Sequence, residues 1–568
     1  MTPAIVILDE AALPLARRIA ALVHGKVCGP EEMTGCDRHY EDVKQELADW
    51  FQFGAPVIGI MAVGILIRVL GPQLHNKKTE PAVLAVSHDG KSVVPLLGGH
   101  HGANDLARRI AEMTGGHAAL TTASDVVLGG SFDAPGPGLV LSALSDMKAA
   151  TQARLRGEEV VTKVTLEPQS GEPGNPHHIV YHPTNVGIGL GCERGCDPAE
   201  LKALVDDTLR KNRIAPQAVS AYATIDLKED EAAMRQFGNL RLFTPAELAG
   251  YDAKVPNPSA TVKAETGTAS VSEAAALAVF GGEARLLVPK TKSARATVAI
   301  AQGTHATFTA KGRAPGAVRL VGIGPGARGM MSGDVIRVLQ TTTDWVGYSL
   351  YLDLVESLRR GQQRHDYPLG DEEARCRAAI ELAKQGKSVA LVCSGDAGIY
   401  AMAALVYELI DREPARVAVE VHPGISAFQA ASARVGAMIG HDFCCISLSD
   451  LLTPWEVIEK RLKAAAEGDF VIAFYNPRSL KRRDQLQRAF EILQPHRRPD
   501  TPVVIASNLG RPEENIRIRS FAEFNPEEVD MLTLVMVGSS QSKAFTRGDG
   551  RTYAYTPRGY ARKMDQPK

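Results

Sequence analysis

The sequence predicts a multidomain α/β protein. Its 568 residues correspond to about three to five domains of ordinary size. Apolar runs typical of strands alternate with amphipathic runs typical of helices, which favours sheets that are largely parallel. In the second half, several β-rich runs each end in Gly, Pro, Asn or Ser, as strands do where they enter turns.

The composition is that of a folded protein with no strong charge preference. Apolar residues make up 45% and charged residues 23%, which excludes a disordered or collagen-like chain. The net charge of −1 disfavours binding to nucleic acid or to an anionic membrane over a whole surface. The longest apolar stretch, 56–71, contains Arg68 and is shorter than the ~20 residues of a membrane span, so we expect a buried strand–turn–helix. Eight cysteines are too few for a disulfide scaffold, which favours the cytoplasm.

Strands and helices follow one another from the start of the chain. In the first half, AIVILD at 4–9 and PAVLAVS at 81–87 are expected strands, and each is followed by a helical pattern. In the second half the expected strands begin at AVRLVGIGPG and continue to LTLVMVGSS. Segments rich in Gly, Pro and Ser divide the chain. The expected segments are 1–125, an α/β domain; 126–183, a linker or small middle region; 184–302, a second α/β domain; 303–316, a linker; 317–427 and 428–548, two lobes of a further α/β region; and 549–568, a tail.

The motif VGIGPGARG at 321–329 predicts a turn that lets a ligand approach the backbone. Gly322, Gly324 and Gly326 have no side chain to block that approach. The spacing G-x-G-x-G, with Pro325 inside it, is not the dinucleotide-binding spacing, and no Lys-Ser/Thr follows as in a P-loop. A nucleotide-binding module is therefore disfavoured, and a plain strand-to-helix turn is the structural alternative.

Four further strands end in turns that carry polar groups. SGDAGIY at 394–400 puts Asp396 at the end of a buried strand, and VHPGIS at 421–426 leads into a small-residue helix. FYNPRS at 474–479 and ASNLG at 506–510 complete the series. Ligands of open parallel sheets bind at the carboxyl ends of the strands, so these turns are candidates for one common site.

In this order, the five elements resemble the tetrapyrrole methyltransferases, above all the precorrin-3B C(17)-methyltransferases and their cobalt counterparts. The closer resemblance depends on VGYSLYLDLV at 346–355, SGDAGIYAMA at 394–403, SLSDLLTPW at 447–455 and FYNPRS at 474–479. It implies a two-lobed methyltransferase that uses S-adenosylmethionine as the methyl donor, methylates C-17 and contracts the ring. Both metal-free and cobalt-containing substrates fit this expectation.

The resemblance also implies which residues form this site. A general base would take a proton from a ring hydroxyl, and the candidates are Asp396, Tyr348 and Asp450. Arg478, inside the fourth motif, is expected to bind a substrate carboxylate, which an Arg fork pairs with well. The expected cofactor contacts are Gly324, Pro325, Gly326, Gly395, Asp396, Ile399, Tyr400, Ser426, Ala427, Tyr475, Asn476, Asn508 and Gly510.

The first half resembles cobalt-precorrin-5A hydrolase. The resemblance covers RVLGPQLHNKKTEPAVLAVSHDGKSVVPLLGGHHGANDLA at 68–107, LTTASD at 120–125, VGIGLGCERG at 186–195, SVSEAAAL at 270–277 and LLVPKTKSARATVAIA at 286–301. It implies a reaction that opens a δ-lactone and releases acetaldehyde. The alternative is a non-catalytic scaffold that binds an intermediate for the methyltransferase.

Two adjacent histidines are the expected base of the hydrolase reaction. His100 and His101 lie in a glycine-flanked loop, histidine is a residue type suited to general-base catalysis at neutral pH, and the sequence does not rank one above the other. The expected substrate-binding residues are Lys77, Glu80, Asn104 and Asp125.

The expected partner of both halves is a tetrapyrrole. Any cobalt would arrive inside that substrate, and no resident metal is expected. His24, Cys28, Cys36 and His39 have spacings that lack the paired C-x₂₋₄-C of a zinc site. The resemblance allows a homodimer formed through the methyltransferase half.

Overall fold

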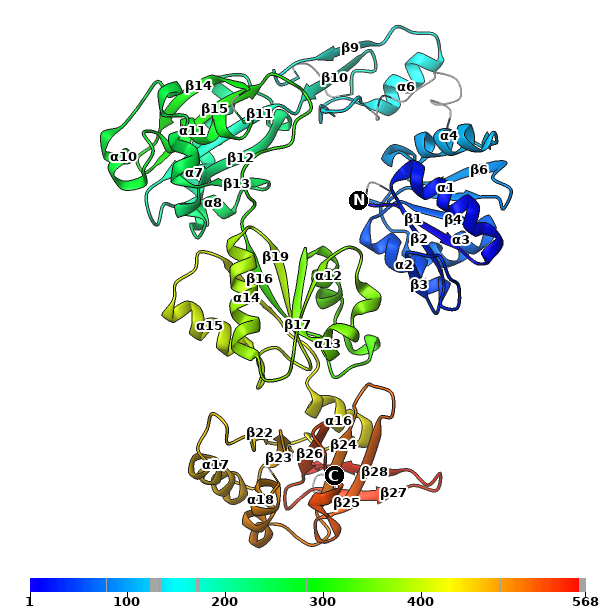
Figure 1. The fold of residues 1–568 in the computed structure, drawn as a ribbon, viewed down its shortest axis with the longest axis vertical. Coiled ribbons are helices and arrows are strands. Elements are labelled where there is room, and N and C mark those ends of the chain that lie inside the picture. Colours follow the sequence, from blue (N-terminus) through cyan, green and yellow to red (C-terminus); the bar gives the residue numbers. More distant parts are fainter. Residues whose placement is uncertain are drawn as a thin grey trace, which may run out of the picture. The chain divides into compact units, whose positions relative to one another are not determined.

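The computed structural model describes residues 1–77, 79–122, 132, 135–169, 174–281, 283–479 and 483–560, with only the backbone of residue 100. The chain divides into two compact units, Met1–Pro315 and Gly316–Lys568. Each unit combines helices with several sheets, so the prediction of a multidomain α/β protein is confirmed (Figure 1). No helix within the described ranges is both long and apolar enough to cross a membrane.

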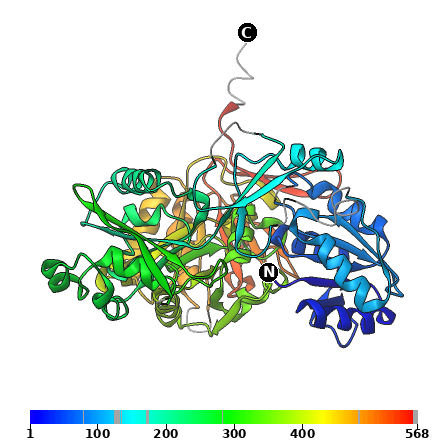
Figure 2. The same ribbon diagram turned by 90° about the horizontal axis from the view of Figure 1, so that it is seen from above.

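A seven-stranded sheet forms the first part of unit 1, drawn in blue in Figures 1 and 2. Its strand order is β3-β2-β1-β4-β5-β6-β7. The strands are β1 (Ala4–Ile7), β2 (Lys26–Pro30), β3 (Arg38–Tyr40), β4 (Val57–Ile60), β5 (Val83–Val86), β6 (Ser92–Leu97) and β7 (His117–Ala118). The helices are α1 (Leu13–Val23), α2 (Val43–Phe53), α3 (Val63–Leu70) and α4 (Ala103–Thr114).

The pattern of β1 explains how helices cover both faces of this sheet. Successive strand residues point to opposite faces, so Ile5 and Ile7 pack with α1 and α4, while Ala4 and Val6 pack with α2 and α3. The apolar stretch 56–71 forms β4 and α3, which confirms the predicted strand–turn–helix. The expectation of parallel strands is wrong for β5 and β6. A tight turn, in which Gly90 N donates to Ser87 O at 2.8 Å, joins them and requires antiparallel pairing.

The middle of unit 1 is a small folded region. β8 (Leu139–Leu141), β9 (Val161–Val164) and β10 (His178–Pro183) form a sheet in the order β8-β10-β9, beside α6 (Met147–Leu155). A small separate core holds it together, made of Ala150, Ala153, Val160, Ile179 and Tyr181.

The last part of unit 1 is a five-stranded sheet in the order β13-β12-β11-β15-β14. The strands are β11 (Val186–Cys192), β12 (Val219–Ile225), β13 (Leu240–Phe243), β14 (Ala284–Lys292) and β15 (Ala296–Gly303). The helices are α7 (Pro198–Lys211), α8 (Ala232–Arg235), α9 (Pro245–Ala249), α10 (Ala260–Thr266) and α11 (Val271–Ala278).

The glycines of VGIGLGC let α11 lie directly on β11. A Cβ added to Gly189 would lie 1.8 Å from Ser272 O, and one added to Gly187 would lie 2.9 Å from the Phe280 ring. On the opposite face, Ile188 and Leu190 pack against α7. The alternation of glycine and large apolar residues therefore serves helix packing here.

Part of the segment expected as a linker, 303–316, packs on unit 1. The Phe308 and Phe280 ring centroids are 4.5 Å apart, and Arg313 pairs with Leu242 in an isolated β-bridge. Gly316 belongs to unit 2, where its carbonyl accepts from Ala418 N at 3.0 Å.

The first lobe of unit 2 is a parallel sheet in the order β18-β17-β19-β16-β20. Residues of β16 that point to one face pack with α14 and α15, and those that point to the other face pack with α12. The strands are β16 (Ala317–Gly322), β17 (Asp344–Tyr348), β18 (Gln363–Tyr367), β19 (Ser388–Cys393) and β20 (Ala418–His422). The helices are α12 (Gly333–Thr341), α13 (Ser349–Asp353), α14 (Glu372–Lys384) and α15 (Ala403–Arg412).

The second lobe is a mixed sheet in the order β22-β23-β26-β24-β25, with a small sheet in the order β21-β28-β27 beside it. Its helices are α16 (Ala427–Val435), α17 (Trp455–Glu467) and α18 (Gln485–Leu493). Ala554 of β28 is fully buried, so the segment expected as a tail contributes to this core up to β28. The strands are β21 (Gly436–Ala437), β22 (Phe443–Ser447), β23 (Val471–Tyr475), β24 (Pro502–Ser507), β25 (Asn515–Ser520), β26 (Thr533–Val537), β27 (Lys543–Thr546) and β28 (Thr552–Tyr555).

Candidate functional site

Two glycine-rich turns meet at the carboxyl edge of the first lobe of unit 2. β16 and β19 are parallel neighbours, and the chain continues to pair after both strands end. Gly324 N donates to Gly395 O at 3.1 Å, and Gly395 N donates to Gly324 O at 2.8 Å. Both residues have positive φ, +74° and +66°, which glycine adopts without strain. The sequence predicted both as cofactor contacts, and the fold brings them together.

Asp396 ties a third strand end to these turns. Its Oδ1 accepts from Gly398 N at 2.8 Å, and its Oδ2 accepts from Gly424 N, just after β20, at 3.0 Å. A Cβ on Gly424 would lie 2.2 Å from Gly395 O, so only glycine fits there. Because both oxygens accept backbone N–H groups, the geometry favours a role in holding the loops. The sequence prediction did not include Gly424, although the Pro–Gly pair after the strand was an available signal.

The start of α16 lies beside the same turns. A Cβ built on Gly395 would have Ser426 Cα and Ala427 N as its nearest neighbours, each 4.0 Å away. Ser426 is the buried N-cap of α16, and its N–H donates to the Gln429 side chain at 2.9 Å. Ile399 packs against the core that α16 helps to form. The predicted contacts at Gly395, Ile399, Ser426 and Ala427 therefore lie in one region.

Two tyrosines line this region from different elements. Tyr400 has a φ of +50°, which is rare for a large side chain and costs about 1–3 kcal/mol. Backbone strain of this kind clusters at functional sites. Its hydroxyl donates to Cys445 O at 2.9 Å, and its ring centroid is 5.2 Å from that of Tyr475. Tyr400 is 54% exposed although its hydroxyl is held. Burial raises the pKa of Tyr475 above its usual value, so this phenol stays protonated.

Two asparagines turn the chain after strands of the second lobe. Asn476 follows β23 with a φ of +48°, and its side-chain amide donates to Ser447 Oγ at 3.2 Å. Asn508 follows β24 with a φ of +51°, and Asn tolerates this conformation better than most residues. Gly510 lies against Gly326, where an added Cβ would be 2.9 Å from Gly510 O. The close approach of Gly510 to Gly326 joins the second lobe to the first glycine-rich turn.

The arrangement fits the cofactor that the resemblance implies. S-adenosylmethionine offers a flat adenine, ribose hydroxyls and an amino-acid end, so it needs an apolar or aromatic surface and a few polar groups. The half-exposed Tyr400 ring supplies such a surface. Gly395 itself is buried, but the position that a Cβ would take there has Ser426 Cα and Ala427 N as its nearest neighbours, each 4.0 Å away.

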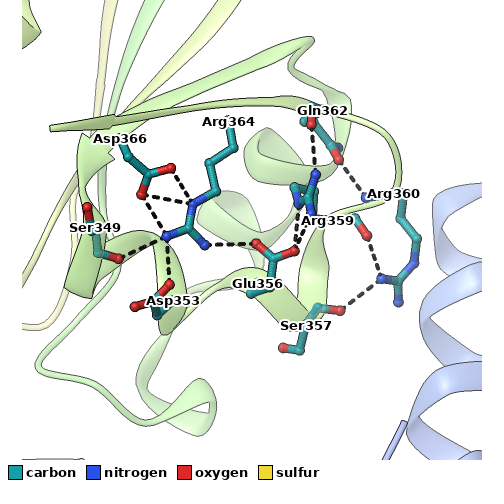
Figure 3. A network of polar contacts seen from close by, with 9 residues as sticks. All are labelled: Ser349, Asp353, Glu356, Ser357, Arg359, Arg360, Gln362, Arg364 and Asp366. Carbon is teal, nitrogen blue, oxygen red and sulfur yellow. Dashed lines mark hydrogen bonds and ion pairs between the residues drawn. The ribbon is translucent and has the colours of Figure 1, made fainter. Parts of the chain in front are cut away.

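The candidate base Tyr348 ends β17 and adjoins a dense polar network. Its ring meets that of Tyr351 edge-on, with centroids 5.2 Å apart. Figure 3 shows the guanidinium of Arg364 surrounded by Asp353, Glu356 and Asp366. It donates to these carboxylates at 2.6, 3.1 and 2.7 Å and to Ser349 O at 3.3 Å. Hydrogen bonding, to Asp366 above all, raises the pKa of Arg364, so the charge is permanent and fixes the segment after Tyr348.

Arg478, which was predicted to bind a substrate carboxylate, already forms hydrogen bonds within the protein. Its Nη1 donates to Pro526 O at 2.9 Å, and its Nη2 pairs with Glu527 at 2.5 Å. To bind a substrate carboxylate it would have to exchange Glu527, which is largely exposed. Asp450, the third candidate base, accepts from the Gln485 side chain at 2.8 Å.

In unit 1, the GGHHGAN loop joins the end of β6 to α4. A short 3₁₀ turn, Gly99–His101, is enclosed by Gly98 and Gly102, whose φ values are +70° and +86°. A Cβ on Gly98 would lie 2.7 Å from Ala82 N, so the loop starts against the chain that enters β5. His101 is exposed. Asn104 is buried, and its amide donates to Thr122 Oγ1 at 3.0 Å.

Glu80 organises the turn before β5. Its Oε1 accepts from His75 N at 3.1 Å and from Asn76 N at 3.0 Å, and Lys77 lies exposed within that turn. Glu80, which precedes β5 in the chain, and Gly98, which packs against Ala82, thus both lie near the start of β5. Asp125 and the side chain of His100 lie outside the described residues.

No group of three or more His, Cys, Asp and Glu side chains within the described ranges is arranged to hold a metal ion. Cys36, Cys192 and Cys196 are free thiols.

Comparison with known proteins assigns both halves. Residues 317–525 match the family of tetrapyrrole (corrin/porphyrin) methylases. Residues 45–125 match the cobalamin synthesis G N-terminal family, and residues 186–301 match the cobalamin synthesis G C-terminus family. These matches confirm the two resemblances that the sequence motifs indicated.

Individual relatives agree with the family matches. A probable cobalt-factor III C(17)-methyltransferase of Salmonella typhimurium is 46% identical over 241 residues, which cover 42% of this chain and 98% of that protein. The cobalamin biosynthesis protein CobIJ of Mycobacterium tuberculosis is 46% identical over 249 residues, 43% of this chain and 48% of that protein, so the chain spans about half its length. The crystal structure of the methyltransferase CobJ is 39% identical, with a TM-score of 0.40, and covers 43% of this chain and 100% of that one.

Proposed function

Because this chain belongs to the tetrapyrrole (corrin/porphyrin) methylases through residues 317–525, we propose that its second half methylates C-17 of precorrin-3B or of the cobalt analogue. The methyl donor is S-adenosylmethionine, and ring contraction accompanies the transfer. The single observation that carries this proposal is the interlocking of the turns after β16, β19 and β20 through Gly324, Gly395 and Asp396. These turns form one rigid backbone surface at the ligand-binding edge of a parallel sheet.

The protein's part in this reaction is mainly positioning. When bound, the cofactor supplies an electrophilic methyl group on a sulfonium. The turn backbones at Gly324 and Gly395 and the exposed ring of Tyr400 would seat it, and the start of α16 would close one side. Holding the reacting carbon in line with the methyl group provides most of the acceleration in such a displacement.

Ring contraction needs a base that removes a proton from a ring hydroxyl. Of the three candidates, Asp396, Tyr348 and Asp450, we favour Tyr348 for this role. Both carboxylate oxygens of Asp396 already accept backbone N–H groups. Tyr348 ends a strand at the same edge of the sheet, and the Arg364 network fixes the helix that follows it.

The first half, we infer, is a cobalt-precorrin-5A hydrolase. Water attacks the lactone carbonyl while a histidine of the GGHHGAN loop takes its proton, and the acyl C–O bond breaks to leave a carboxylate and a hydroxyl. The hydroxyl then loses its proton and the neighbouring carbon–carbon bond breaks, so that acetaldehyde leaves and the macrocycle carbon takes the electron pair and a proton. Glu80, Asn104, Lys77 and Asp125 complete the proposed substrate site. The Glu80 turn and the buried Asn104–Thr122 bond support it, since both are organised next to the histidine loop.

A homodimer formed through the methyltransferase half belongs to the same proposal, as does a cytoplasmic location. The free thiols of Cys36, Cys192, Cys196, Cys376, Cys393, Cys444 and Cys445 support that location, since the reducing cytosol disfavours disulfides. Sedimentation of the full chain at several concentrations tests the dimer.

Mass spectrometry of the products tests both activities. The full chain is incubated with S-adenosylmethionine and either metal-free or cobalt-loaded substrate, and separately with the cobalt lactone. We expect one added methyl group in the first reaction and loss of a two-carbon aldehyde in the second. Absence of methylation with both substrates would contradict the methyltransferase proposal, and absence of aldehyde from the lactone would contradict the hydrolase proposal.

A further inference from the structure

We propose that Arg511 is a positioning residue that locks the two glycine-rich turns of the first lobe onto the β24–β25 turn of the second lobe, so that cofactor affinity depends on it. The inference rests on the proposed cofactor site and goes beyond it, because it names the group that holds that site together across the two lobes.

One guanidinium reaches the ends of two strands. Arg511 Nε donates to Pro325 O, after β16, at 3.0 Å, and its Nη2 donates to Ser394 Oγ, after β19, at 3.3 Å. Pro325 and Ser394 directly adjoin Gly324 and Gly395, the two residues that exchange backbone hydrogen bonds. Arg511 therefore supports that pair from the side of the second lobe.

The stem of Arg511 also fits the first turn closely. A Cβ on Gly326 would lie 2.5 Å from Arg511 Cγ, so the methylene groups pack on the bare backbone of Gly326. Gly510 has a φ of +67°, and a Cβ there would lie 2.8 Å from Ala327 N. The two turns thus pack so closely that both Gly326 and Gly510 must lack a side chain.

The turn that carries Arg511 is itself braced against α16. Gly510 N donates to Glu514 Oε2 at 2.6 Å, and the same carboxylate pairs with Arg434, in the last turn of α16, at 2.8 Å. α16 begins at Ala427, beside Gly395. These contacts form a continuous network. It connects Arg434, at the end of α16, through Glu514, Gly510 and Arg511 to the two glycine-rich turns, which lie beside the start of α16.

Arginine suits this role better than lysine. Its planar fork donates along two fixed directions at once, whereas an ammonium is a point charge on a flexible stem. Arg511→Lys should keep the charge but satisfy only one of the two acceptors at a time. Arg511→Ala removes both bonds and the packing on Gly326.

The test is calorimetric titration of the full chain with S-adenosylmethionine. We expect Arg511→Ala to weaken binding roughly 10- to 100-fold, as for the loss of hydrogen bonds from a charged group, with Arg511→Lys in between. Arg519→Ala is the matched control, since Arg519 lies on the same hairpin and pairs with Glu528. Its affinity should stay within about twofold of wild type, which is below ~0.5 kcal/mol.

Further measurements separate this role from the alternatives. Steady-state kinetics should show a raised KM for the cofactor with the KM for the tetrapyrrole unchanged, and the reverse pattern would make Arg511 a substrate contact and overturn the proposal. If Arg511→Ala fails to fold, Arg511→Lys and Glu514→Gln decide, because Glu514→Gln loosens the turn without touching Arg511. Wild-type affinity in all these variants would overturn the inference about Arg511 but leave the proposed function standing. Failure of the wild type to bind the cofactor would instead contradict the proposed function.

Discussion

Gly324 and Gly395 exchange two backbone hydrogen bonds, at 3.1 and 2.8 Å, beyond the ends of the parallel strands that carry them. Parallel strands ordinarily diverge into separate loops once they leave the sheet. Here the left-handed backbone of both glycines lets the two loops face each other and form an antiparallel bridge. The result is a backbone surface that is fixed before any ligand arrives, and preorganisation of this kind lowers the cost of binding.

Gly395→Ala should weaken S-adenosylmethionine binding by more than tenfold. Alanine at a φ of +66° costs about 1–2 kcal/mol of stability, and the new methyl group points into the space between Gly395 and the start of α16. Gly370→Ala is the control, because Gly370 has a φ of +100° and open space around it. Cofactor titration with thermal melting separates the two effects. Equal affinities in both variants would mean that strain alone acts and that Gly395 does not face the cofactor.

Asp396→Ala should impair methylation and spare aldehyde release. The change removes the acceptors of Gly398 N and Gly424 N, so the three strand-end turns lose their common partner. We expect cofactor affinity or turnover to fall at least about tenfold, worth ~1.4 kcal/mol. Asp500→Ala, at an exposed pair with Arg498, should leave both reactions unchanged. A smaller loss of cofactor affinity or turnover would mean that Asp396 has only a structural role in its turn.

The double change His100→Gln and His101→Gln should slow aldehyde release by roughly 10²–10⁴-fold, the usual contribution of general acid–base catalysis. Glutamine keeps polarity but cannot accept a proton as a base. C-17 methylation by the same chain serves as the internal control and should stay near wild type. An unchanged rate of aldehyde release would exclude this loop as the source of the base and direct attention to Lys77, Glu80 and Asp125.

Glu273 should make the stability of unit 1 depend on pH below about 4.5. Burial by itself raises the pKa of this carboxyl, but hydrogen bonds from the Asn257 side chain and from Lys290 N–H outweigh burial and lower it below its usual value of 4.5. A folded-state pKa below the unfolded one stabilises the fold above the unfolded pKa, and this stabilisation is lost as the pH falls through the folded pKa.

The variant Glu273→Gln tests this linkage. Urea unfolding of the full chain, followed in unit 1 between pH 7 and pH 3, should give the wild type a steeper loss of stability below pH 4.5 than the variant. At neutral pH the variant should be less stable by about 1–3 kcal/mol, because the introduced amide has one buried acceptor fewer than the carboxylate. Parallel pH profiles for both proteins would show that Glu273 does not titrate in this range.

The residues alone were enough to predict a number of the strands and helices and, with the family resemblance, to propose candidate site residues. Strand periodicity and turn residues predicted the runs that became β1, β16, β19 and β24, since alternation and apolar runs reflect burial directly. The same reasoning led to Gly324, Gly395 and Asp396, because glycine and carboxylate at a strand end are local signals. It failed for the antiparallel β5–β6 pair, where the tight turn at Ser87–Gly90 determines the direction of the strand. The Asp-Gly pair at 89–90 was an available signal of that hairpin.

Contacts between distant parts of the chain depend on the folded structure. The glycines of VGIGLGC look like those of a ligand-binding turn, yet in the fold they admit α11 against β11. Arg511 is one of several arginines near its hairpin in the sequence, and its contacts with distant residues distinguish it, among them the 3.0 Å bond to Pro325, 186 positions earlier. Local sequence determines secondary structure because propensity and burial pattern act over a few residues. The partner of a given donor is decided when sheets and lobes pack, since that brings together groups whose separation along the chain carries no signal.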